Sequence, residues 1–154
     1  MSAAAEWRPP SVTVAAVIGR DGRFLMVEEL HDGRRVLNQP AGHLDPGESL
    51  VEACVREVME ETAHVFVPES LVGIYRWHYA PRDVTYLRFT FAGRVAGFDS
   101  KRTLDTEIIA APWLSREEIL ARRAEHRTEL VEACLEDYLA GRRYPLDVFA
   151  RDYA

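Results

Sequence analysis

The chain has 154 residues, of which 47% are hydrophobic, and a formal net charge of −6 at pH 7. A chain of this length fits one domain with a hydrophobic core of its own. The negative charge argues against a nucleic acid polymer or an anionic membrane as the main partner, because both are negatively charged. Lys101 is the only lysine, which excludes most lysine-based chemistry, such as a Schiff base.

The two cysteines, Cys54 and Cys134, form neither a zinc-binding spacing nor a disulfide framework. Residues 1–10 lack the long apolar core of a signal peptide, and no apolar run approaches membrane-spanning length. We therefore expect a cytoplasmic protein, with a flexible leader over residues 1–10 and a single domain over residues 11–154. A monomer and a homodimer are equally compatible with this composition.

Runs of β-branched and apolar residues alternate with turn signals along the chain. In chain order, the expected strands cover residues 11–18, 23–30, 36–44, 72–79, 85–95 and 108–114. Asp32-Gly33 predicts a hairpin, and Pro40 predicts an edge or irregular strand. Helices are expected over residues 50–62, after the candidate cap Ser115, and over residues 127–140. This mixture predicts an α/β fold in which helices cover both faces of a mixed sheet.

The helix expected over residues 50–62 carries an acidic face. Ser49 is its candidate N-cap, with Glu52 as the capping-box partner. Glu57, Glu60 and Glu61 are spaced i, i+3 and i+4, so they share one side of the helix, while the other side is apolar. Clustered carboxylates need water, a basic partner or a hard cation, and oxygen ligands suit Mg²⁺ or Mn²⁺. A solvated acidic face is the simpler alternative.

The same stretch resembles the Nudix box of the Nudix hydrolases. The resemblance rests on Gly42 and on Glu48, Arg56-Glu57 and Glu60-Glu61, all at the family's spacing, and these acids and this arginine fill every charged position of the box. Two late positions depart from the family pattern, because Ala63 stands where glycine is usual and His64 where an aliphatic residue is usual. The family glycine ends the helix, often in a left-handed conformation, and alanine in that conformation costs on the order of 1 kcal/mol.

The likeness covers roughly residues 12–148, and within that family the chain is similar to the NudJ-type phosphatase branch. Outside the box it is carried by residues 38–44, 86–89 and 141–146. The resemblance implies a Nudix-type α/β/α sandwich with a mixed sheet. It also implies removal of phosphate from nucleoside tri- and diphosphates and from hydroxymethylpyrimidine pyrophosphate.

The resemblance implies a set of metal ligands for Mg²⁺, with Mn²⁺ as a possible substitute: Gly42 through its carbonyl, Glu57, Glu60 and Glu61. The alternative for Gly42 is a turn that needs a positive φ. Arg56 is implied to orient the acids by pairing with Glu48 or a neighbouring glutamate, although an ordinary ion pair would have the same pattern.

Further candidates lie outside the helix. The resemblance implies that an acid from a later loop joins the metal or serves as the base, and Glu107 is preferred over its rival Asp105. We therefore take the catalytic set to be Arg56, Glu57, Glu61 and Glu107.

Four residues are candidates for contact with the substrate, namely Asn38, Gln39, Tyr86 and Arg88. Arg88 lies between apolar neighbours on an expected strand, where an arginine needs a partner such as a phosphate or an internal carboxylate. Trp77 and Tyr75 could stack on a base or belong to the core.

The sequence thus predicts a Mg²⁺-dependent Nudix hydrolase that cleaves phosphoanhydride bonds of nucleotides or of hydroxymethylpyrimidine pyrophosphate and releases orthophosphate. One alternative within the enzyme class is a pyrophosphate-releasing nucleotide or sugar-nucleotide pyrophosphohydrolase. A second alternative is a non-catalytic Nudix domain that only senses a nucleotide, although such domains usually lose box acids, which are complete here.

Overall fold

The computed structural model describes residues 6–151. Residues 1–5 of the expected leader and residues 152–154 of the expected domain lie outside the described part, and residues 6–10 contain no helix or strand. Within the described part, no helix combines the length and the hydropathy needed to cross a membrane.

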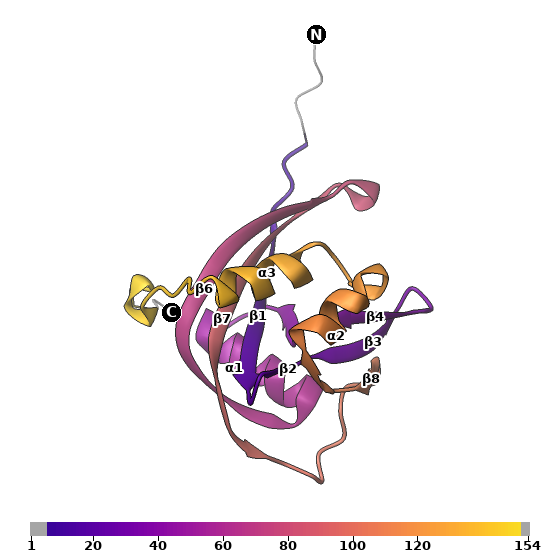
Figure 1. Ribbon diagram of the computed structural model, residues 1–154. Helices are drawn as coiled ribbons and strands as arrows, with labels where there is room; N and C mark the ends of the chain where they lie inside the picture. Colours follow the sequence, from indigo (N-terminus) through magenta and orange to yellow (C-terminus); the bar gives the residue numbers. More distant parts are fainter. Residues whose placement is uncertain (1–5, 152–154) are drawn as a thin grey trace.

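A six-stranded mixed sheet forms the centre of the molecule (Figure 1). The strands follow the order β6-β7-β1-β2-β9, and β5 also pairs with β1. Strands β1 and β7 are parallel, and the other pairs are antiparallel. The strand bounds are β1 Ser11–Arg20, β2 Arg23–Leu25, β5 Ala41–His43, β6 His64–Tyr79, β7 Val84–Phe98 and β9 Trp113–Ser115.

A smaller antiparallel sheet has the order β4-β3-β8. Its strands are β3 Val27–His31, β4 Arg34–Asn38 and β8 Ile108–Ala110. Asp32 and Gly33 join β3 to β4 with φ angles of 50° and 74°, the left-handed pair that a tight hairpin turn requires. The predicted hairpin is therefore confirmed.

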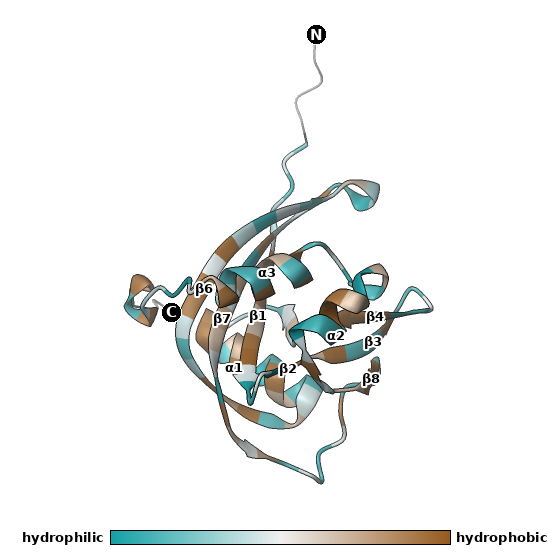
Figure 2. Ribbon diagram, in the orientation of Figure 1, coloured by the Kyte–Doolittle hydropathy of each residue, from teal (hydrophilic) through white to brown (hydrophobic). Residues whose placement is uncertain are grey.

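Helices cover both faces of the main sheet, as predicted. The helices are α1 Leu50–Thr62, α2 Arg116–Ala121 and α3 Leu130–Leu139, with short 3-10 turns at η1 Ala80–Arg82, η2 Arg123–Glu125 and η3 Leu146–Val148. Side chains alternate along β1, so Val14, Ala16 and Ile18 pack into one core with α1, while Val17 packs into a second core with α2 and α3. Figure 1 shows α3 crossing in front of the sheet, and Figure 2 shows that β1 is largely hydrophobic.

Three strands that the sequence predicts as continuous are interrupted. The strand expected over residues 23–30 breaks at Met26, whose amide donates to the Pro112 carbonyl over 2.9 Å, and the chain passes from β2 of the main sheet to β3 of the smaller one. The strand expected over 108–114 divides in the same way into β8 and β9, and the strand over 36–44 breaks before Ala41. Conversely, β6 begins at His64, earlier than predicted.

Local signals define both ends of α1. The Ser49 hydroxyl accepts from the Glu52 amide over 3.1 Å, and the Glu52 carboxylate accepts from the Ser49 amide over 3.2 Å, so the predicted capping box is present. At the other end Ala63 adopts a left-handed conformation with φ 58° and ψ 20°, and its amide donates to the Met59 carbonyl over 2.9 Å. Helix α1 therefore ends as the Nudix pattern predicts, but on an alanine.

Candidate active site

Helix α1 presents its charged side chains because its opposite side is buried. Ala53, Cys54 and Val58 are almost fully buried against the core that includes β1 and β7. Arg56, Glu57 and Glu60 then lie on the part of the helix that is not used for packing, and all three keep intermediate exposure.

Arg56 connects the glycine-containing loop to the acidic face of α1. Its Nε and Nη2 donate to both oxygens of Glu48 over 3.0 and 2.6 Å. Its Nη1 donates to Glu57 over 2.8 Å and to Glu60 over 3.1 Å, and its Nη2 also donates to the His43 carbonyl over 2.9 Å. A guanidinium held by a bidentate carboxylate has little freedom, so Arg56 fixes the orientation of Glu57 and Glu60. Hydrogen bonding to Arg56 also lowers the pKa of Glu48.

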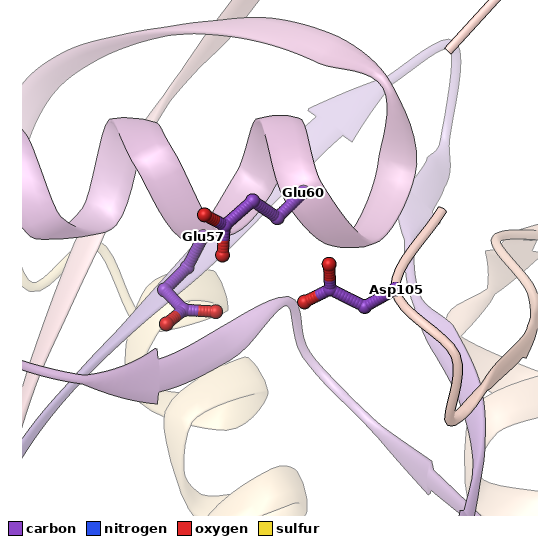
Figure 3. Close-up of side chains that lie close together, drawn as sticks. All are labelled: Glu57, Glu60 and Asp105. Carbon is purple, nitrogen blue, oxygen red and sulfur yellow. The ribbon is translucent and has the colours of Figure 1, made fainter. Parts of the chain in front are cut away.

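Three carboxylates converge beside α1 (Figure 3): Glu57 and Glu60 from the helix and Asp105 from the loop between β7 and β8. One oxygen from each lies within 4.8 Å of the other two. The loop is attached to the helix through its backbone, because the Asp105 amide donates to the Glu60 carbonyl over 3.1 Å. This bond uses a carbonyl in the last turn of α1, which has no partner within the helix.

Gly42 on β5 makes room for the Glu57 carboxylate. The position that a Cβ of residue 42 would occupy is already filled by the carboxylate atoms of Glu57. Gly42 does not have a positive φ, in contrast to Gly47 in the following turn. The alternative prediction, a turn that needs a positive φ at residue 42, is therefore wrong, and close approach of Glu57 is the reason for glycine at this position.

Glu61 lies outside the three-carboxylate group. The step of about 100° between consecutive helical residues turns it toward β5, where its side chain is buried and its Oε1 accepts from the Ala41 amide over 2.8 Å. Its other oxygen has no hydrogen bond to any described residue. The assignment of Glu61 as a metal ligand stays a prediction, and that second oxygen is the atom that it would offer.

Two of these glutamates resist ionisation when no cation is present. Burial raises the pKa of Glu57 to about 7, although hydrogen bonding to Arg56 opposes this effect. Burial, together with the nearby charges of Glu29, Glu57 and Asp105, raises the pKa of Glu61 to about 9, and the hydrogen bond from Ala41 opposes it. A region in which carboxylates resist ionisation gains most from added positive charge.

The donor set therefore fits a hard divalent cation. Glu57, Glu60 and Asp105 offer only carboxylate oxygens, the ligands that Mg²⁺ and Mn²⁺ prefer, and Gly42 leaves space for one of these carboxylates. Glu107, the acid preferred from the sequence, is exposed and is not part of the three-carboxylate group, whereas its rival Asp105 is.

Sequence reasoning missed one buried acid near this group. Glu29 on β3 is 6% exposed and pairs with Arg127 over 2.6 Å, and its charge contributes to the raised pKa of Glu61. The signal was available, because Glu29 is two residues after the buried Val27 and therefore points to the same side of the strand.

Arg88 is a buried cation without a carboxylate partner. It is 6% exposed, its Nη2 donates to Gln39 Oε1 over 2.8 Å, and both of its terminal nitrogens lie 3.5 Å from Asn38 Oδ1. Its Nε is buried without any hydrogen-bond partner, and its recorded side-chain partners in the described residues are the amides of Asn38 and Gln39, not an acid. The internal salt bridge that the sequence left open is therefore not found in the part of the chain that the structure describes.

The other predicted substrate residues have different surroundings. Gln39 is 2% exposed and both ends of its amide form hydrogen bonds, because its Nε2 donates to the Val131 carbonyl of α3 over 2.7 Å while its Oε1 accepts from Arg88. Asn38 is also buried beside Arg88. Tyr86 and Trp77 are half-buried and are paired across β7 and β6. Tyr75 instead packs against the core that contains α3 and donates its hydroxyl proton to Asp137 over 2.7 Å.

Comparison with known proteins adds a family-level match. The model of the NUDIX domain matches residues 7–134. The protein named phosphatase NudJ from Escherichia coli strain K12 is 40% identical over 139 residues, which cover 90% of this chain and 90% of that protein.

Solved structures show the same fold. A structure described as a NUDIX hydrolase from Nitrosomonas europaea is 57% identical, with a TM-score of 0.92, and covers 94% of this chain and 98% of that one. An ADP-ribose pyrophosphatase from Streptococcus suis is similar in fold alone, at 21% identity and a TM-score of 0.64 over 84% of this chain and 92% of that one.

Proposed function

The chain belongs to the Nudix hydrolase family and is an enzyme of that family, and on this premise we propose that it is a Mg²⁺-dependent phosphatase. Its proposed substrates are nucleoside tri- and diphosphates or hydroxymethylpyrimidine pyrophosphate, from which it releases orthophosphate. The single observation that carries the proposal is the convergence of Glu57, Glu60 and Asp105 beside α1. The name phosphatase borne by the Escherichia coli relative supports release of orthophosphate.

Nudix hydrolases generally use divalent metals, and here the ion would be held by Glu57, Glu60 and Asp105, with Glu61 and the Gly42 carbonyl as further ligands. A bound Mg²⁺ supplies charge neutralisation for the phosphates and a lowered pKa for the attacking water. Mn²⁺ can replace Mg²⁺ in a site made of oxygen donors. The support for this assignment is the carboxylate-only donor set and the raised pKa values of Glu57 and Glu61.

The side chains of the site have separate tasks in the proposed reaction. Arg56 is a positioning residue, because its bidentate contact with Glu48 keeps the carboxylates of Glu57 and Glu60 in one orientation. A carboxylate of the site accepts the proton of the water that attacks phosphorus. Asp105 is the better candidate than Glu107 for an acid supplied by the β7–β8 loop, because Asp105 belongs to the three-carboxylate group.

Arg88 is proposed to bind a phosphate of the substrate. A buried guanidinium held only by neutral amide oxygens keeps its full positive charge available to an anion. Asn38 and Gln39 then act on the substrate through Arg88, because they hold its terminal nitrogens in place.

The proposal is tested with a panel of ATP, ADP, CTP and hydroxymethylpyrimidine pyrophosphate, scored separately for orthophosphate and pyrophosphate, with Mg²⁺ and with chelator. We expect orthophosphate release that requires Mg²⁺. Release of pyrophosphate alone would favour a pyrophosphohydrolase, and nucleotide binding without turnover would favour a sensing domain; either result would overturn the proposal.

A further inference from the structure

Three aromatic side chains lie together on the outer half of the β6–β7 hairpin. The rings of Trp77 and Tyr79 are stacked, with centroids 5.5 Å apart and an interplanar angle of 23°. The ring of Tyr86 lies 5.7 Å from that of Trp77. All three side chains are half-buried, and none belongs to either hydrophobic core. Aromatic faces that are kept near solvent in one group are suited to stacking against a planar ligand.

The rings are on the same face of the sheet as Arg88. Tyr86 and Arg88 are two residues apart on β7, so their side chains point to the same side. On β6, Trp77 is paired with Tyr86 and Tyr75 is paired with Arg88. The aromatic group therefore adjoins a guanidinium that is more than nine-tenths buried and has an unpartnered Nε.

The order and pairing of the strands determine how far these rings lie from the carboxylates. Thr13 of β1 is paired with His43 of β5 on one side and with Arg88 of β7 on the other. The strands therefore follow each other as β5, β1, β7 and β6. Gly42 is paired with Val14 of the α1 core and touches Glu57, so the carboxylates lie on the α1 side of β5, whereas Arg88 and the rings face the α3 side. A substrate that contacts both passes around the sheet at β5. Three strand spacings span about 14 Å along the sheet, from the rings to the point at β5 where the path turns to the α1 side. A nucleoside that carries a short phosphate chain extends over a comparable length.

Glu129, the residue before α3, holds Trp77 in place. Its Oε2 accepts from Trp77 Nε1 over 2.8 Å, and its Oε1 has no hydrogen bond to any residue of the described part. The acids that follow on the same helix differ, because Glu132 pairs with Arg123 and Glu136 pairs with Arg116. Glu129 is thus an acid beside the aromatic rings with one acceptor oxygen to spare. An ionised carboxylate accepts hydrogen bonds and cannot donate one, so it attracts an amino group and repels a carbonyl oxygen.

We propose that Trp77 and Tyr86 stack on the aromatic ring of the substrate and that Glu129 selects rings that bear an amino group. The favoured substrates are then phosphoanhydrides of cytosine, adenine, guanine or an aminopyrimidine, and uracil and thymine compounds are disfavoured. This inference rests on the proposed function, which supplies the phosphates at Arg88 and at the carboxylates. It goes further by naming the class of ring, one that bears an amino group, and the residue that selects it, Glu129.

The test compares CTP and UTP analogues in which a methylene group replaces the β,γ-bridging oxygen. The two rings differ at position 4, which is an amino group in cytosine and a carbonyl in uracil. Binding is measured by titration calorimetry with Mg²⁺, so no turnover is required. We expect the wild-type protein to bind the cytosine analogue tighter by about tenfold or more, as suits a hydrogen bond to a charged group.

Two variants, each with a matched control, test whether Glu129 causes the preference for cytosine and whether Trp77 contributes to binding. Glu129→Gln keeps an acceptor for Trp77 but presents an amide donor to the ring, so the cytosine preference should disappear or invert. Trp77→Leu should weaken binding of both analogues by about tenfold. Glu132→Gln on the same helix and Phe98→Leu, an exposed aromatic at the other end of β7, should leave both affinities unchanged.

Equal binding of the two analogues by the wild-type protein, or an unchanged preference in Glu129→Gln, would overturn the inference. If Mg²⁺-dependent phosphate release persists in that case, the proposed function stands and only the ring selection fails. A cytosine preference in a protein that releases no phosphate would overturn the proposed function and support the ring selection.

Discussion

The carboxylate of Glu57 occupies the space where a side chain of Gly42 would begin. This contact joins β5 to α1 at the three-carboxylate group. Even alanine at residue 42 would therefore displace Glu57 rather than a core residue. The position therefore offers a way to disturb the proposed metal site without disturbing the hydrophobic core.

We predict that Gly42→Ala raises the Mg²⁺ concentration needed for half-maximal turnover by about tenfold or more, because Glu57 must move away from its present orientation. The melting temperature should change little, since the displaced group is the end of a flexible side chain. Gly97→Ala is the control, because a Cβ there meets only Val65 at ordinary contact distance. A Gly42→Ala variant with wild-type Mg²⁺ dependence would show that the position of Glu57 does not matter.

The raised pKa values of Glu57 and Glu61, about 7 and about 9, predict how stability depends on pH without metal. Both values lie above the ordinary value of about 4.3 in the unfolded chain, so the folded protein binds more protons over this interval. The stabilising contribution is complete below about pH 4.3 and is lost as the pH rises through 7 and then 9.

Thermal melts between pH 6.5 and 9 in chelator should therefore show falling stability, and Mg²⁺ should raise the melting temperature more at the alkaline end. In Glu61→Gln, which cannot ionise at this position, the fall should be shallower. A wild-type protein and a Glu61→Gln variant with the same pH slope would contradict the assigned shift.

Ala63 offers a test of backbone strain. Its left-handed conformation is unfavourable for alanine by about 1 kcal/mol, and Ala63→Gly should raise the free energy of unfolding by a few tenths of a kcal/mol up to that value. The loss of a buried methyl group keeps the gain below the full strain. The matched change Ala53→Gly, inside α1, should lower stability by at least about 1 kcal/mol. Denaturant unfolding of both variants measures these changes, and an Ala63→Gly protein less stable than wild type would contradict the predicted backbone strain at Ala63.

Arg88 should prove to be a binding residue rather than a structural ion pair. We predict that Arg88→Lys raises KM for a nucleotide on the order of tenfold, because lysine keeps the charge but lacks the planar fork. Gln39→Glu should raise KM as well, since a carboxylate at residue 39 would compete with the phosphate for Arg88. Steady-state kinetics and melting are measured on the same samples. Unchanged KM together with a clearly lowered melting temperature would make Arg88 structural.

The sequence predicted the parts of the fold that depend on neighbouring residues. The capping box of Ser49 and Glu52, the hairpin at Asp32-Gly33 and the end of α1 at Ala63 are all local, and the structure contains each of them. The breaks at Met26 and around Pro112 were not predictable in the same way. A run of apolar residues indicates burial, but which of two sheets a strand joins is decided by contacts with distant parts of the chain.

In the candidate site too, features that depend on nearby residues were predicted and features that depend on distant contacts were not. Glu48 and Arg56 are eight residues apart, and the Nudix resemblance implied that Arg56 pairs with Glu48 or with a neighbouring glutamate; the structure contains both kinds of contact. The preference for Glu107 over Asp105 depended on an irregular loop, and the position of Asp105 is set by one backbone hydrogen bond to Glu60. The apolar neighbours of Arg88 predicted that it needs a partner, but not that it would be buried against Asn38 and Gln39, about 50 residues earlier in the chain.

The central claim is that Glu57, Glu60 and Asp105 hold the cation on which hydrolysis depends, and a Mg²⁺ titration of orthophosphate release tests it most directly. Wild type and Glu60→Gln are compared, with Glu69→Gln, an exposed acid on β6, as the control. We predict no release in chelator, a half-saturating Mg²⁺ concentration about tenfold or more higher in Glu60→Gln, and wild-type behaviour in Glu69→Gln. Release that does not require a divalent metal, or the same Mg²⁺ dependence in Glu60→Gln as in wild type, would contradict the claim.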